Sequence, residues 1–341
     1  MRVLLDTTYA QRGPTGTGVY LEQLSAALRE LGVEVVEAAN PRRRAPAGGG
    51  LGSWRNAAED RRWTAAVLPR RAREVNADVV HHPLPAHSAR CDAPQVVTVH
   101  DLGFERVPEA FDPRFRAFAR RAHRAAARRA AAVICPSETT AADVRARWGV
   151  PGERLVVAPH GPGQPLVAAP ATPAHLLYVG DEEPRKNLER LLAAYSRFRA
   201  GATDPPALVL AGPAPRSVPE GVRVEPAPAR ERLAELYAGA VALVHPSLHE
   251  GFGLTLAEAM AAGVPLVAAR SPGVTETAGA AALYFDPRDT ADLVAALARV
   301  TGDPALRERL RGDGRERAAE LSWERSARLH VDAYTLAGPI P

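Results

Sequence analysis

Short hydrophobic runs alternate with amphipathic segments along the whole chain. The hydrophobic runs predict strands at 2–6, 33–38, 78–82, 95–100, 131–137, 154–159, 175–180, 207–212, 222–226, 242–247, 265–270 and 281–285. Helical spacing of apolar residues predicts helices at 17–31, 113–130, 138–147, 187–200, 229–238, 254–262, 288–301 and 304–320. Continuously apolar strands separated by helices are typical of parallel sheets covered on both faces. The pattern predicts an α/β fold built from doubly wound, Rossmann-like sheets.

A break in this pattern divides the chain. Residues 161–174 are rich in Pro, Gly and Ala and show no periodicity, which indicates a linker. A chain of 341 residues is also long for a single core. We therefore expect an N-terminal domain at 1–163, a linker at 164–172 and a C-terminal domain at 173–321. A second irregular stretch, 41–54, is expected to be a long loop inside the first domain.

The charge is unevenly distributed. Residues 1–160 carry 24 arginines against 17 acidic residues, a net +7, whereas the remainder carries 19 basic against 22 acidic residues, a net −3. The basic half could contact an anionic surface, or it could be an ordinary solvated surface. In 111–130, many arginines accompany Phe111, Phe115 and Phe118 at helical spacing. We expect these phenylalanines to pack into the core; contact with a membrane surface or with a phosphate of the acceptor is the alternative.

Several protein classes are disfavoured. No stretch approaches 18 uninterrupted apolar residues, so no segment is expected to span a membrane. The N-terminus leads directly into a strand without a signal region, and Cys91 and Cys135 do not form a disulfide framework. We expect a cytoplasmic protein, with at most peripheral membrane contact through its basic N-terminal domain, and no nucleic-acid partner.

The most informative segment is HPSLHEGFGLTLAEAMAAGVPLVAA at 245–269. Glu250 lies in a loop after a predicted strand, and Glu258 lies about one turn inside the next helix. The glycines around Phe252 let the backbone approach a ligand, and the helix N-terminus suits a phosphate. Two carboxylates close to a phosphate site suit the recognition of sugar hydroxyls. Metal ligation would need more oxygen ligands together than this segment supplies.

This segment resembles the E-x7-E signature of the retaining GT-B glycosyltransferases of family four. The resemblance extends over nearly the whole chain, through TGTGVYLEQLSAALRELG, VTVHDLGFERVPEAF, ICPSETTAADV and LLYVGDEEPRKNLERLLAAY in family order. The tail LSWERSARLHVDAY resembles the final helix of that family, which returns to the first domain, so 322–341 would complete it. The resemblance implies two Rossmann-like domains with an interdomain cleft.

The resemblance also implies roles for the residues of the signature. Glu250 would contact hydroxyls of the donor sugar, and Glu258 would hold the ribose hydroxyls of the nucleotide. The backbone N–H groups of the segment that joins them would face the sugar and the diphosphate. That segment comprises Gly251, Phe252, Gly253 and Leu254.

The loop EPRKN at 183–187 contains Lys186, the only lysine beside 42 arginines. In the family, an Arg/Lys pair at this position clamps the donor diphosphate, and Arg185 and Lys186 match it. Lysine is a compact ammonium group, whereas arginine is a wide planar fork, so a narrow position beside Arg185 would admit only lysine. A surface lysine kept by chance is the alternative. Many relatives have an arginine where this chain has Asp181, and we expect Arg185 to replace that charge.

The N-terminal domain contributes further candidates. Gly16 and Gly18 resemble the family's glycine loop, which we expect just before a helix that starts near Val19. His100 and Asp101 match its V-H-D segment, where the histidine lies near the transferred sugar. Tyr9 is expected on the acceptor side.

The histidines do not predict a metal site. His81 and His82 are adjacent in a strand and therefore face opposite sides, and no Cys or carboxylate spacing completes a zinc site. The resemblance agrees, because the family neutralises the leaving diphosphate without a metal ion. No cofactor is expected.

The implied reaction is transfer of a hexosyl unit from a UDP- or GDP-sugar to an acceptor hydroxyl, with retention at the anomeric carbon. Two alternatives are a catalytically inactive relative that binds nucleotide sugars and a nucleotide-sugar epimerase on the same fold. The intact Glu250, Glu258, Arg185 and Lys186 argue against an inactive relative, and the E-x7-E segment argues against an epimerase.

Overall fold

A computed structural model describes residues 1–12, 15–43, 51–163, 171–212 and 215–338. The chain forms two compact units. Unit 1 comprises Met1–Leu102, Pro113–His160 and Trp323–Pro341, and unit 2 comprises Gly103–Asp112 and Gly161–Ser322. Gly103–Asp112 belongs to unit 2, although the residues before and after it in the chain belong to unit 1. The domain bounds expected at 1–163 and 173–321 stay predictions. Most of the predicted linker, 164–170, lies outside the described residues.

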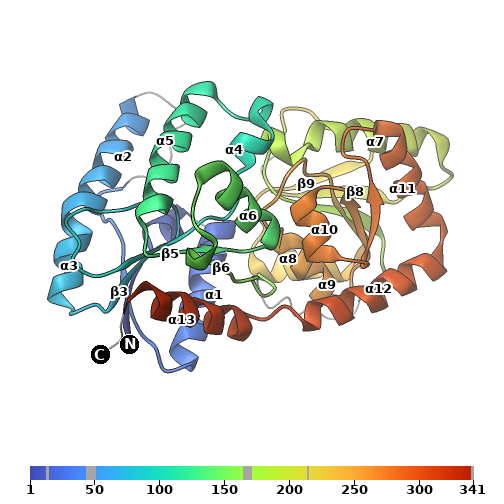
Figure 1. Ribbon diagram of the computed structural model, residues 1–341. Coiled ribbons are helices and arrows are strands. Elements are labelled where there is room, and N and C mark those ends of the chain that lie inside the picture. The colour runs from blue at the N-terminus through green and yellow to red at the C-terminus, as the bar shows by residue number, and fades with distance from the viewer. Residues whose placement is uncertain (13–14, 44–50, 164–170, 213–214, 339–341) are drawn as a thin grey trace. The chain divides into compact units, whose positions relative to one another are not determined.

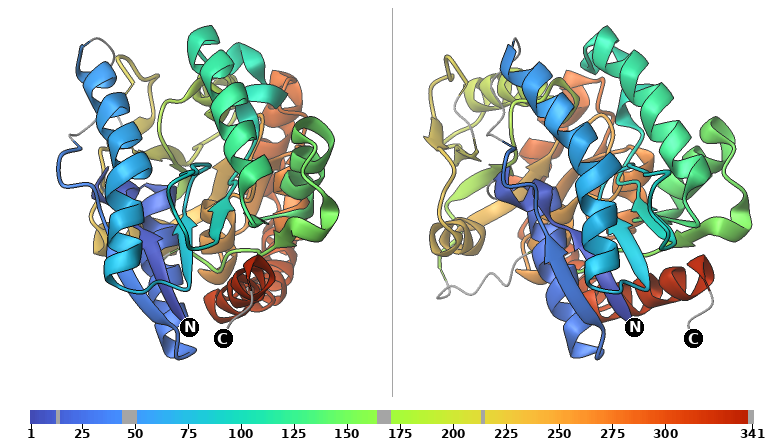
Figure 2. Two further views of the ribbon diagram at one scale, coloured as in Figure 1. Left: turned by 60° about the vertical axis from the view of Figure 1, so that its left-hand side comes forward. Right: turned by 90° about the vertical axis from the view of Figure 1, so that its left-hand side faces the viewer.

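Unit 1 is built on a parallel sheet of six strands in the order β2-β1-β3-β4-β5-β6 (Figure 1). The strands are β1 Arg2–Asp6, β2 Glu34–Ala38, β3 Val79–His82, β4 Gln95–Thr98, β5 Ala132–Cys135 and β6 Leu155–Val157. Every residue of β3, β4 and β5 is buried, and the polar ones among them, such as His81 and Gln95, are hydrogen-bonded. β1 is paired in register with β2, so Leu4 lies opposite Val36, and Figure 2 shows these two strands side by side.

Helices cover this sheet. They are α1 Gly16–Glu30, α2 Leu51–Arg62, the π-helical turn η2 Trp63–Val67, α3 Leu68–Glu74, α5 Pro113–Arg129, α6 Glu138–Asp143 and α13 Trp323–Ala337. The loop predicted at 41–54 is wrong from Leu51 onward, because α2 begins there. The sequence around it is so rich in charge that few apolar residues mark its buried side, among them Trp63 and Leu68. Ser137 caps α6, accepting a hydrogen bond from Thr140 N at 3.1 Å.

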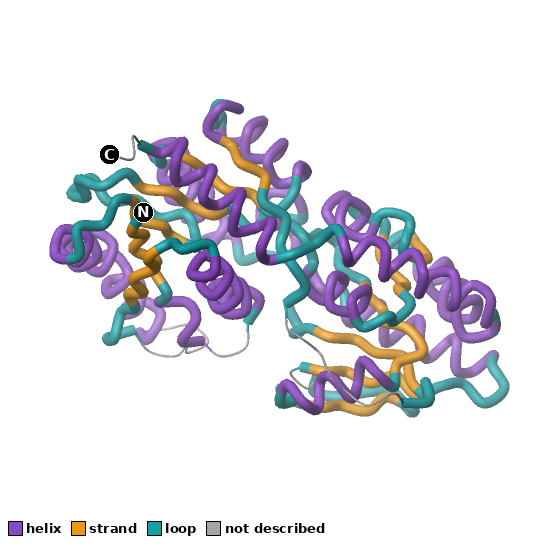
Figure 3. The backbone as a smooth tube through the Cα atoms, turned by 90° about the horizontal axis from the view of Figure 1, so that it is seen from below, coloured by secondary structure: helices purple, strands orange, loops and turns teal. Residues whose placement is uncertain are grey.

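Unit 2 has a second parallel sheet of six strands in the order β12-β11-β10-β7-β8-β9. Its strands are β7 His175–Val179, β8 Ala207–Ala211, β9 Val222–Glu225, β10 Ala240–His245, β11 Leu266–Ala269 and β12 Ala282–Phe285. Its helices are α4 Gly103–Arg106, α7 Leu188–Gly201, α8 Arg230–Ala238, α9 Leu254–Ala261, α10 Pro272–Ala278, α11 Thr290–Gly302 and α12 Pro304–Ala319. In each unit the strands lie between helices, as Figure 3 shows. The predicted doubly wound α/β architecture is confirmed.

The helix α13 joins unit 1 through a buried network of histidine and tyrosine side chains. The Tyr334 hydroxyl lies 2.8 Å from His81 Nδ1, and His81 Nε2 lies 2.8 Å from Thr98 Oγ1. The Tyr20 hydroxyl bridges Thr98 Oγ1 at 2.9 Å and His330 Nε2 at 2.8 Å. These bonds satisfy polar groups that would otherwise be costly to bury, and they fix the final helix onto α1 and the sheet.

The expected packing of the α5 phenylalanines is wrong. The side chains of Phe115 and Phe118 are 45% and 63% exposed. The buried residues of α5 are the small ones Ala119, Ala126 and Ala127. Because alanines suffice to pack α5 onto its neighbours, the helix approaches closely and its phenylalanines remain on the outer side. Contact of this helix with a membrane surface stays a prediction.

We predict that acidification destabilises unit 1 below about pH 6.5. Burial lowers the pKa of His100 and His330 to about 4, and it holds the pKa values of His81 and His160 well below 6.5. Between pH 4 and 6.5 the unfolded chain therefore binds more protons than the folded chain. The free energy of unfolding consequently decreases as the pH is lowered. Each such histidine costs about 1.4 kcal/mol at pH 5.5 relative to neutral pH.

Urea unfolding at pH 7.5 and pH 5.5 measures this effect, and His330→Gln should reduce the proton uptake on unfolding by about one. The carboxylate of Glu250 does not interfere. Its folded pKa lies well below 4.5, so its contribution is lost only as the pH falls below 4.5. Equal stability at the two pH values would contradict the prediction.

Candidate active site

Two loops at the carboxyl ends of neighbouring strands of unit 2 form the centre of the site. One loop follows β7 and contains the short helical turn Pro184–Lys186; the other follows β10 and contains Glu250. Because β7 and β10 are adjacent and parallel, both loops emerge at the same edge of the sheet. Residues that are about 64 positions apart in the chain are thereby brought into contact.

Glu250 is held between two cations. Its Oε1 lies 2.8 Å from Lys186 Nζ, and its Oε2 lies 3.1 Å from Arg185 Nη1. The side chain of Glu250 is 8% exposed, and those of Arg185 and Lys186 are 16% and 17% exposed. The three groups therefore carry a net charge of +1 in a largely desolvated position. Such a cluster attracts an anion that bears more charge than one carboxylate.

The charges of this cluster determine its protonation. Burial by itself raises the pKa of Glu250, but the charges of Lys186 and Arg185 outweigh burial and hold that pKa well below its usual range. His245, at the end of β10, is neutral at pH 7, because burial lowers its pKa more than Glu250 raises it. Its Nε2 atom lies 3.5 Å from Glu250 Oε1, and its Nδ1 atom lies 3.3 Å from Thr255 Oγ1. His245 is thus a neutral neighbour that orients the carboxylate.

Backbone contacts fix the two loops to each other. The Leu248 N–H donates to the Arg185 carbonyl at 2.8 Å, and Asn187 Nδ2 donates to the Pro246 carbonyl at 3.1 Å. A Cβ atom at Gly273, in the first turn of α10, would lie 1.9 Å from the Glu250 carbonyl oxygen. Only glycine permits this approach, so α10 supports the backbone of Glu250 directly.

The segment after Glu250 leads into α9. Gly253 precedes the helix with φ +88° and caps it without a side-chain hydrogen bond. The backbone N–H groups at the start of α9 can therefore serve an anion. The ring of Phe252 is 6% exposed and packs in the core of unit 2, so only its backbone is available to a ligand.

Glu258 is buried on α9 and accepts a hydrogen bond from the Tyr237 hydroxyl at 3.0 Å. Burial, followed by the nearby Glu258, raises the pKa of Tyr237 well above 10, so the hydroxyl keeps its proton and donates. This partner could not be predicted from local spacing, because Tyr237 lies on α8, 21 residues before Glu258. Tyr237 occupies one of the acceptor positions of the Glu258 carboxylate and thereby fixes the direction of the other acceptor positions.

We predict that Tyr237→Phe weakens nucleotide binding and leaves the chemical step intact. Loss of one hydrogen bond to a charged group costs about 1.5–3 kcal/mol, and the flexibility gained by Glu258 would appear as a KM raised about tenfold or more. Steady-state kinetics measure the separation of KM and kcat. Tyr195→Phe, which removes a buried hydroxyl that binds the Pro206 and Gly221 carbonyls of the same unit, is the control. A kcat that falls as much as KM rises would contradict this role.

The remaining sequence candidates lie in unit 1. Gly16 and Gly18 are not in a loop before the helix: α1 begins at Gly16, and Thr15 caps it by accepting from Gly18 N at 3.2 Å. The capping threonine starts the helix one residue before the predicted span 17–31 and three residues before Val19. His100 lies two residues beyond β4, with its ring edge-on to Tyr20 at 4.9 Å between centroids. Asp101 directly follows it.

Tyr9 lies near the end of β1, beneath the Arg43 guanidinium at 4.8 Å. Among the described residues, no group of three or more His, Cys, Asp or Glu side chains is arranged to hold a metal ion. Metal independence stays a prediction. No helix in the described part of the chain is long and apolar enough to cross a membrane.

Comparison with known proteins identifies the family. Residues 14–161 match Glycosyltransferase Family 4, and residues 167–317 match Glycosyl transferases group 1. The chain therefore belongs to the GT-B glycosyltransferases of the family-four type.

Similar sequences include the O-antigen chain mannosyltransferase B of Escherichia coli, 34% identical over 48% of this chain and 46% of that protein. The MMP alpha-(1->4)-mannosyltransferase of Mycolicibacterium hassiacum is 31% identical over 62% of this chain and 55% of its own. A D-inositol 3-phosphate glycosyltransferase of a Nocardioides species is 41% identical over 34% of this chain and 26% of its own. The chain thus spans about a quarter to a little over half of the length of these relatives.

Solved structures with the same fold cover nearly the whole chain. Sucrose-phosphate synthase from Thermosynechococcus elongatus superposes with a TM-score of 0.77 and 22% identity, covering 98% of both chains. Anabaena HepE, solved in complex with UDP-glucose, superposes with a TM-score of 0.71 and 16% identity, again over 98% of both chains. These similarities show the GT-B fold.

Proposed function

We propose that the protein transfers a hexosyl unit from a UDP- or GDP-sugar to an acceptor hydroxyl. The observation that carries this proposal is the Glu250 carboxylate held between Arg185 and Lys186, beside the N-terminus of α9. A nucleoside diphosphate supplies the additional negative charge that the two cations and the helix end can neutralise. Glu250 would then be released in part to accept hydrogen bonds from the donor sugar.

The residues of this site support a division of roles. Arg185 and Lys186 would stabilise the departing diphosphate, Glu250 would orient the sugar, and Glu258 would bind the ribose. Gly251, Phe252, Gly253 and Leu254 would contribute backbone N–H groups. His100 would approach the transferred sugar from unit 1, with Asp101 beside it, and Gly16 and Gly18 would contact donor phosphates or acceptor. Catalysis then rests on positioning and on stabilisation of developing charge.

We further propose that the reaction is metal-independent and retains the anomeric configuration. Two cations already face the diphosphate position, so a divalent ion has little left to neutralise. With no side chain assigned as nucleophile, the acceptor would attack on the face that the diphosphate leaves, and the leaving phosphate would take the acceptor proton. Full activity in excess chelator and an NMR assignment of the product anomer test these two points.

Mannose is one candidate for the donated sugar, because two of the relatives named above are mannosyltransferases. Donor consumption without an acceptor, giving a new nucleotide sugar, would instead indicate an epimerase.

The experiment that tests the function is a melting-temperature series with UDP, GDP, ADP and TDP on the wild type and on Lys186→Ala. A ligand at 100 times its Kd stabilises the folded state by about 2.7 kcal/mol. We expect one diphosphate to raise the melting temperature of the wild type and to have little effect on the variant. If none of the four stabilises the wild type, the donor-binding proposal fails. Binding without turnover of any nucleotide sugar would indicate an inactive relative.

We also propose that the protein acts at the cytoplasmic face of a membrane and contacts it through α5. Phe115 and Phe118 are exposed, and Arg114, Arg120 and Arg121 accompany them on the same exposed helix. Co-sedimentation should be stronger with phosphatidylglycerol vesicles than with phosphatidylcholine vesicles, and Phe118→Ser should weaken it several-fold. Leu336→Ser, at an exposed leucine on α13, is the matched control. Binding that does not depend on lipid charge or on Phe118 would contradict this contact.

A further inference from the structure

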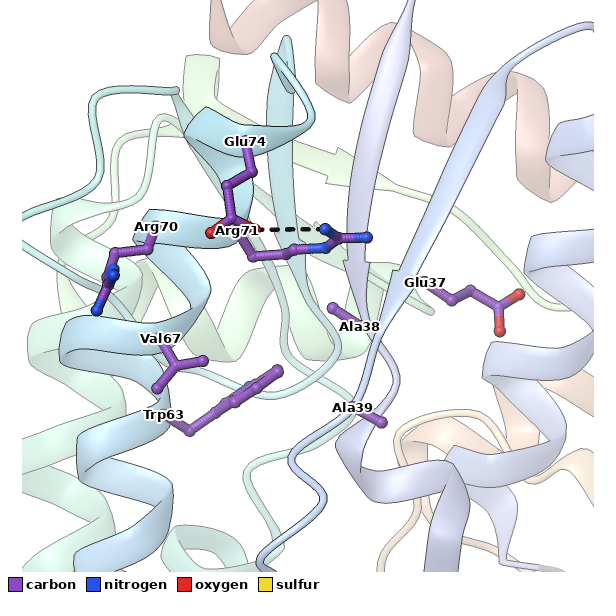
Figure 4. Close-up of a pocket in the computed structure, with 8 residues that line it drawn as sticks. All are labelled: Glu37, Ala38, Ala39, Trp63, Val67, Arg70, Arg71 and Glu74. Atoms are coloured by element: carbon purple, nitrogen blue, oxygen red, sulfur yellow. Dashed lines mark hydrogen bonds and ion pairs between the residues drawn. The ribbon is translucent and has the colours of Figure 1, made fainter.

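Unit 1 contains two cavities that share Trp63 in their walls. The larger, of about 300 Å³, lies between the end of β2 and α3 (Figure 4). Arg70 lines it, and of its other charged groups Arg71 lies 3.3 Å from Glu74, while Glu37 binds Ser25 and Arg29 outside the cavity. The smaller, of about 60 Å³, is lined by residues that follow β1 and β3. It has room for several water molecules and therefore for the hydroxyl-bearing edge of a small ring.

Asp6 is a fixed hydrogen-bond acceptor in the smaller cavity. Its carboxylate is 4% exposed, and its Oδ1 accepts from Thr8 N at 3.1 Å and from Thr8 Oγ1 at 2.5 Å. Its Oδ2 accepts from Trp63 Nε1 at 3.1 Å, which also fixes the indole ring in the wall. A carboxylate has about four lone-pair positions, so Asp6 retains capacity for a ligand.

His82 also lines this cavity, and its ring is held in a fixed orientation. Its Nε2 lies 3.2 Å from Gln95 Oε1, which also accepts from Ser88 N at 2.8 Å, while Gln95 Nε2 donates to the Ser88 carbonyl. These bonds fix the orientation of the Gln95 amide, so His82 Nε2 carries the hydrogen and Nδ1 carries a lone pair. Nδ1 is buried and has no hydrogen-bond partner among the described residues. Burial lowers the pKa of His82, which keeps the ring neutral.

The other described lining residues add aromatic surface, and none of them is an unpaired cation. Tyr9 lines the cavity, and the Arg43 guanidinium that covers its ring is bound to Asp60, with Nε 2.8 and 3.0 Å from the two carboxylate oxygens. His123, on α5, is neutral at pH 7, because burial lowers its pKa to about 4. The cavity thus offers acceptor atoms and aromatic rings to a ligand.

We infer that this cavity binds a neutral polyhydroxylated ring, a sugar or a cyclitol, as the acceptor of the proposed transfer. Hydroxyl groups donate to Asp6 and to Asp60, while Tyr9 and Trp63 contact the apolar face of the ring. A phosphorylated ring is disfavoured, because among the described lining residues a phosphate would meet two carboxylates and no unpaired cation. This inference rests on the proposed function, because the bound ring is interpreted as the acceptor of the glycosyl transfer.

Matched ligands test the chemical class. Calorimetry and saturation-transfer NMR would compare myo-inositol with inositol 3-phosphate, methyl α-mannopyranoside with mannose 1-phosphate, and methyl α-glucopyranoside with glucose 1-phosphate. We expect at least one neutral ligand to bind at least tenfold more tightly than its phosphorylated counterpart. Equal or tighter binding of the phosphorylated members, or no binding of any neutral member, would overturn the inference. So would tighter binding of methyl glucosaminide than of every neutral ligand, because that would indicate recognition of an ammonium group.

Two substitutions on the same helical turn separate this cavity from its neighbour. Thr64 lines the smaller cavity and Val67 the larger one, and both belong to η2. Thr64→Leu should fill the smaller cavity and weaken binding of the neutral ligand at least tenfold. Val67→Leu, which also adds bulk on η2, should change it less than twofold. Equal effects of the two substitutions would contradict the assignment to the smaller cavity.

Nucleotide binding distinguishes a failure of this inference from a failure of the proposed function. The melting-temperature shift with the nucleoside diphosphate should be the same in the wild type, Thr64→Leu and Val67→Leu, because these residues lie in unit 1 and the cation pair lies in unit 2. If that shift is present and no neutral ring binds, this inference fails and the proposed function stands. If neutral rings bind and no nucleotide does, the cavity is a carbohydrate site and the proposed function fails.

Discussion

Glu250→Gln should abolish nearly all hexosyl transfer and make the free nucleoside diphosphate bind more tightly. Glutamine preserves the shape of the side chain but removes the charge that Lys186 and Arg185 share at 2.8 and 3.1 Å. The donor sugar would lose its carboxylate partner, and removal of one such preorganised group lowers kcat by about 10²–10³-fold. The charge of the cluster would rise from +1 to +2, which favours the diphosphate.

The substitution should also lower the melting temperature, because two largely buried cations lose their counter-ion; bound diphosphate should restore it. Glu183→Gln is the matched control. Glu183 Oε2 also binds Arg185, at 2.7 Å, but its side chain is 49% exposed, and pairs at such positions contribute little. We expect Glu183→Gln to change the rate of hexosyl transfer by less than about threefold. Near-normal turnover of Glu250→Gln would remove the basis of the assignment.

Lys186→Arg should impair transfer although it keeps the charge. Lys186 Nζ shares Glu250 Oε1 with His245 Nε2, which lies 3.5 Å from that oxygen, and Arg185 occupies Oε2. A planar guanidinium is wider than an ammonium group and cannot fit between these neighbours without displacing one of them. We expect kcat/KM to fall by about tenfold to 10²-fold for arginine and by about 10²–10³-fold for alanine.

Arg288→Lys controls for exchange between the two basic residue types. Arg288 pairs with Glu109 at 3.2 Å, and its side chain is 66% exposed, so the change should leave activity within twofold of the wild type. Nucleotide-dependent melting of Lys186→Arg separates lost binding from lost chemistry. Full activity of Lys186→Arg would mean that the site does not require the narrow shape of lysine. The position of the single lysine would then reflect chance.

The strands could be predicted closely because their signal is local. β4 and β5 are buried on both faces, so every residue in them is apolar or internally bonded, and the pattern is visible over four residues. The hydrophobic pattern predicted no helix at α2 and α3. These helices bury few large side chains, and many of their other positions are charged, so no apolar helical spacing is visible. Phe115 and Phe118 were misplaced for the opposite reason: a regular apolar spacing indicates one face of a helix and does not say whether that face is covered.

The sequence by itself determined the fold class and the composition of the donor-side loop, because Glu250, its glycines and the start of α9 are contiguous and their geometry is local. Only the tertiary structure decided what these groups contact. The pairing of Glu250 with Lys186 and Arg185 depends on β7 and β10 being neighbours in the sheet, and the bond from Tyr237 to Glu258 depends on how α8 packs. The cavity at Asp6, Trp63 and His82 unites segments whose contact no short-range pattern encodes, since packing rather than spacing brings them together.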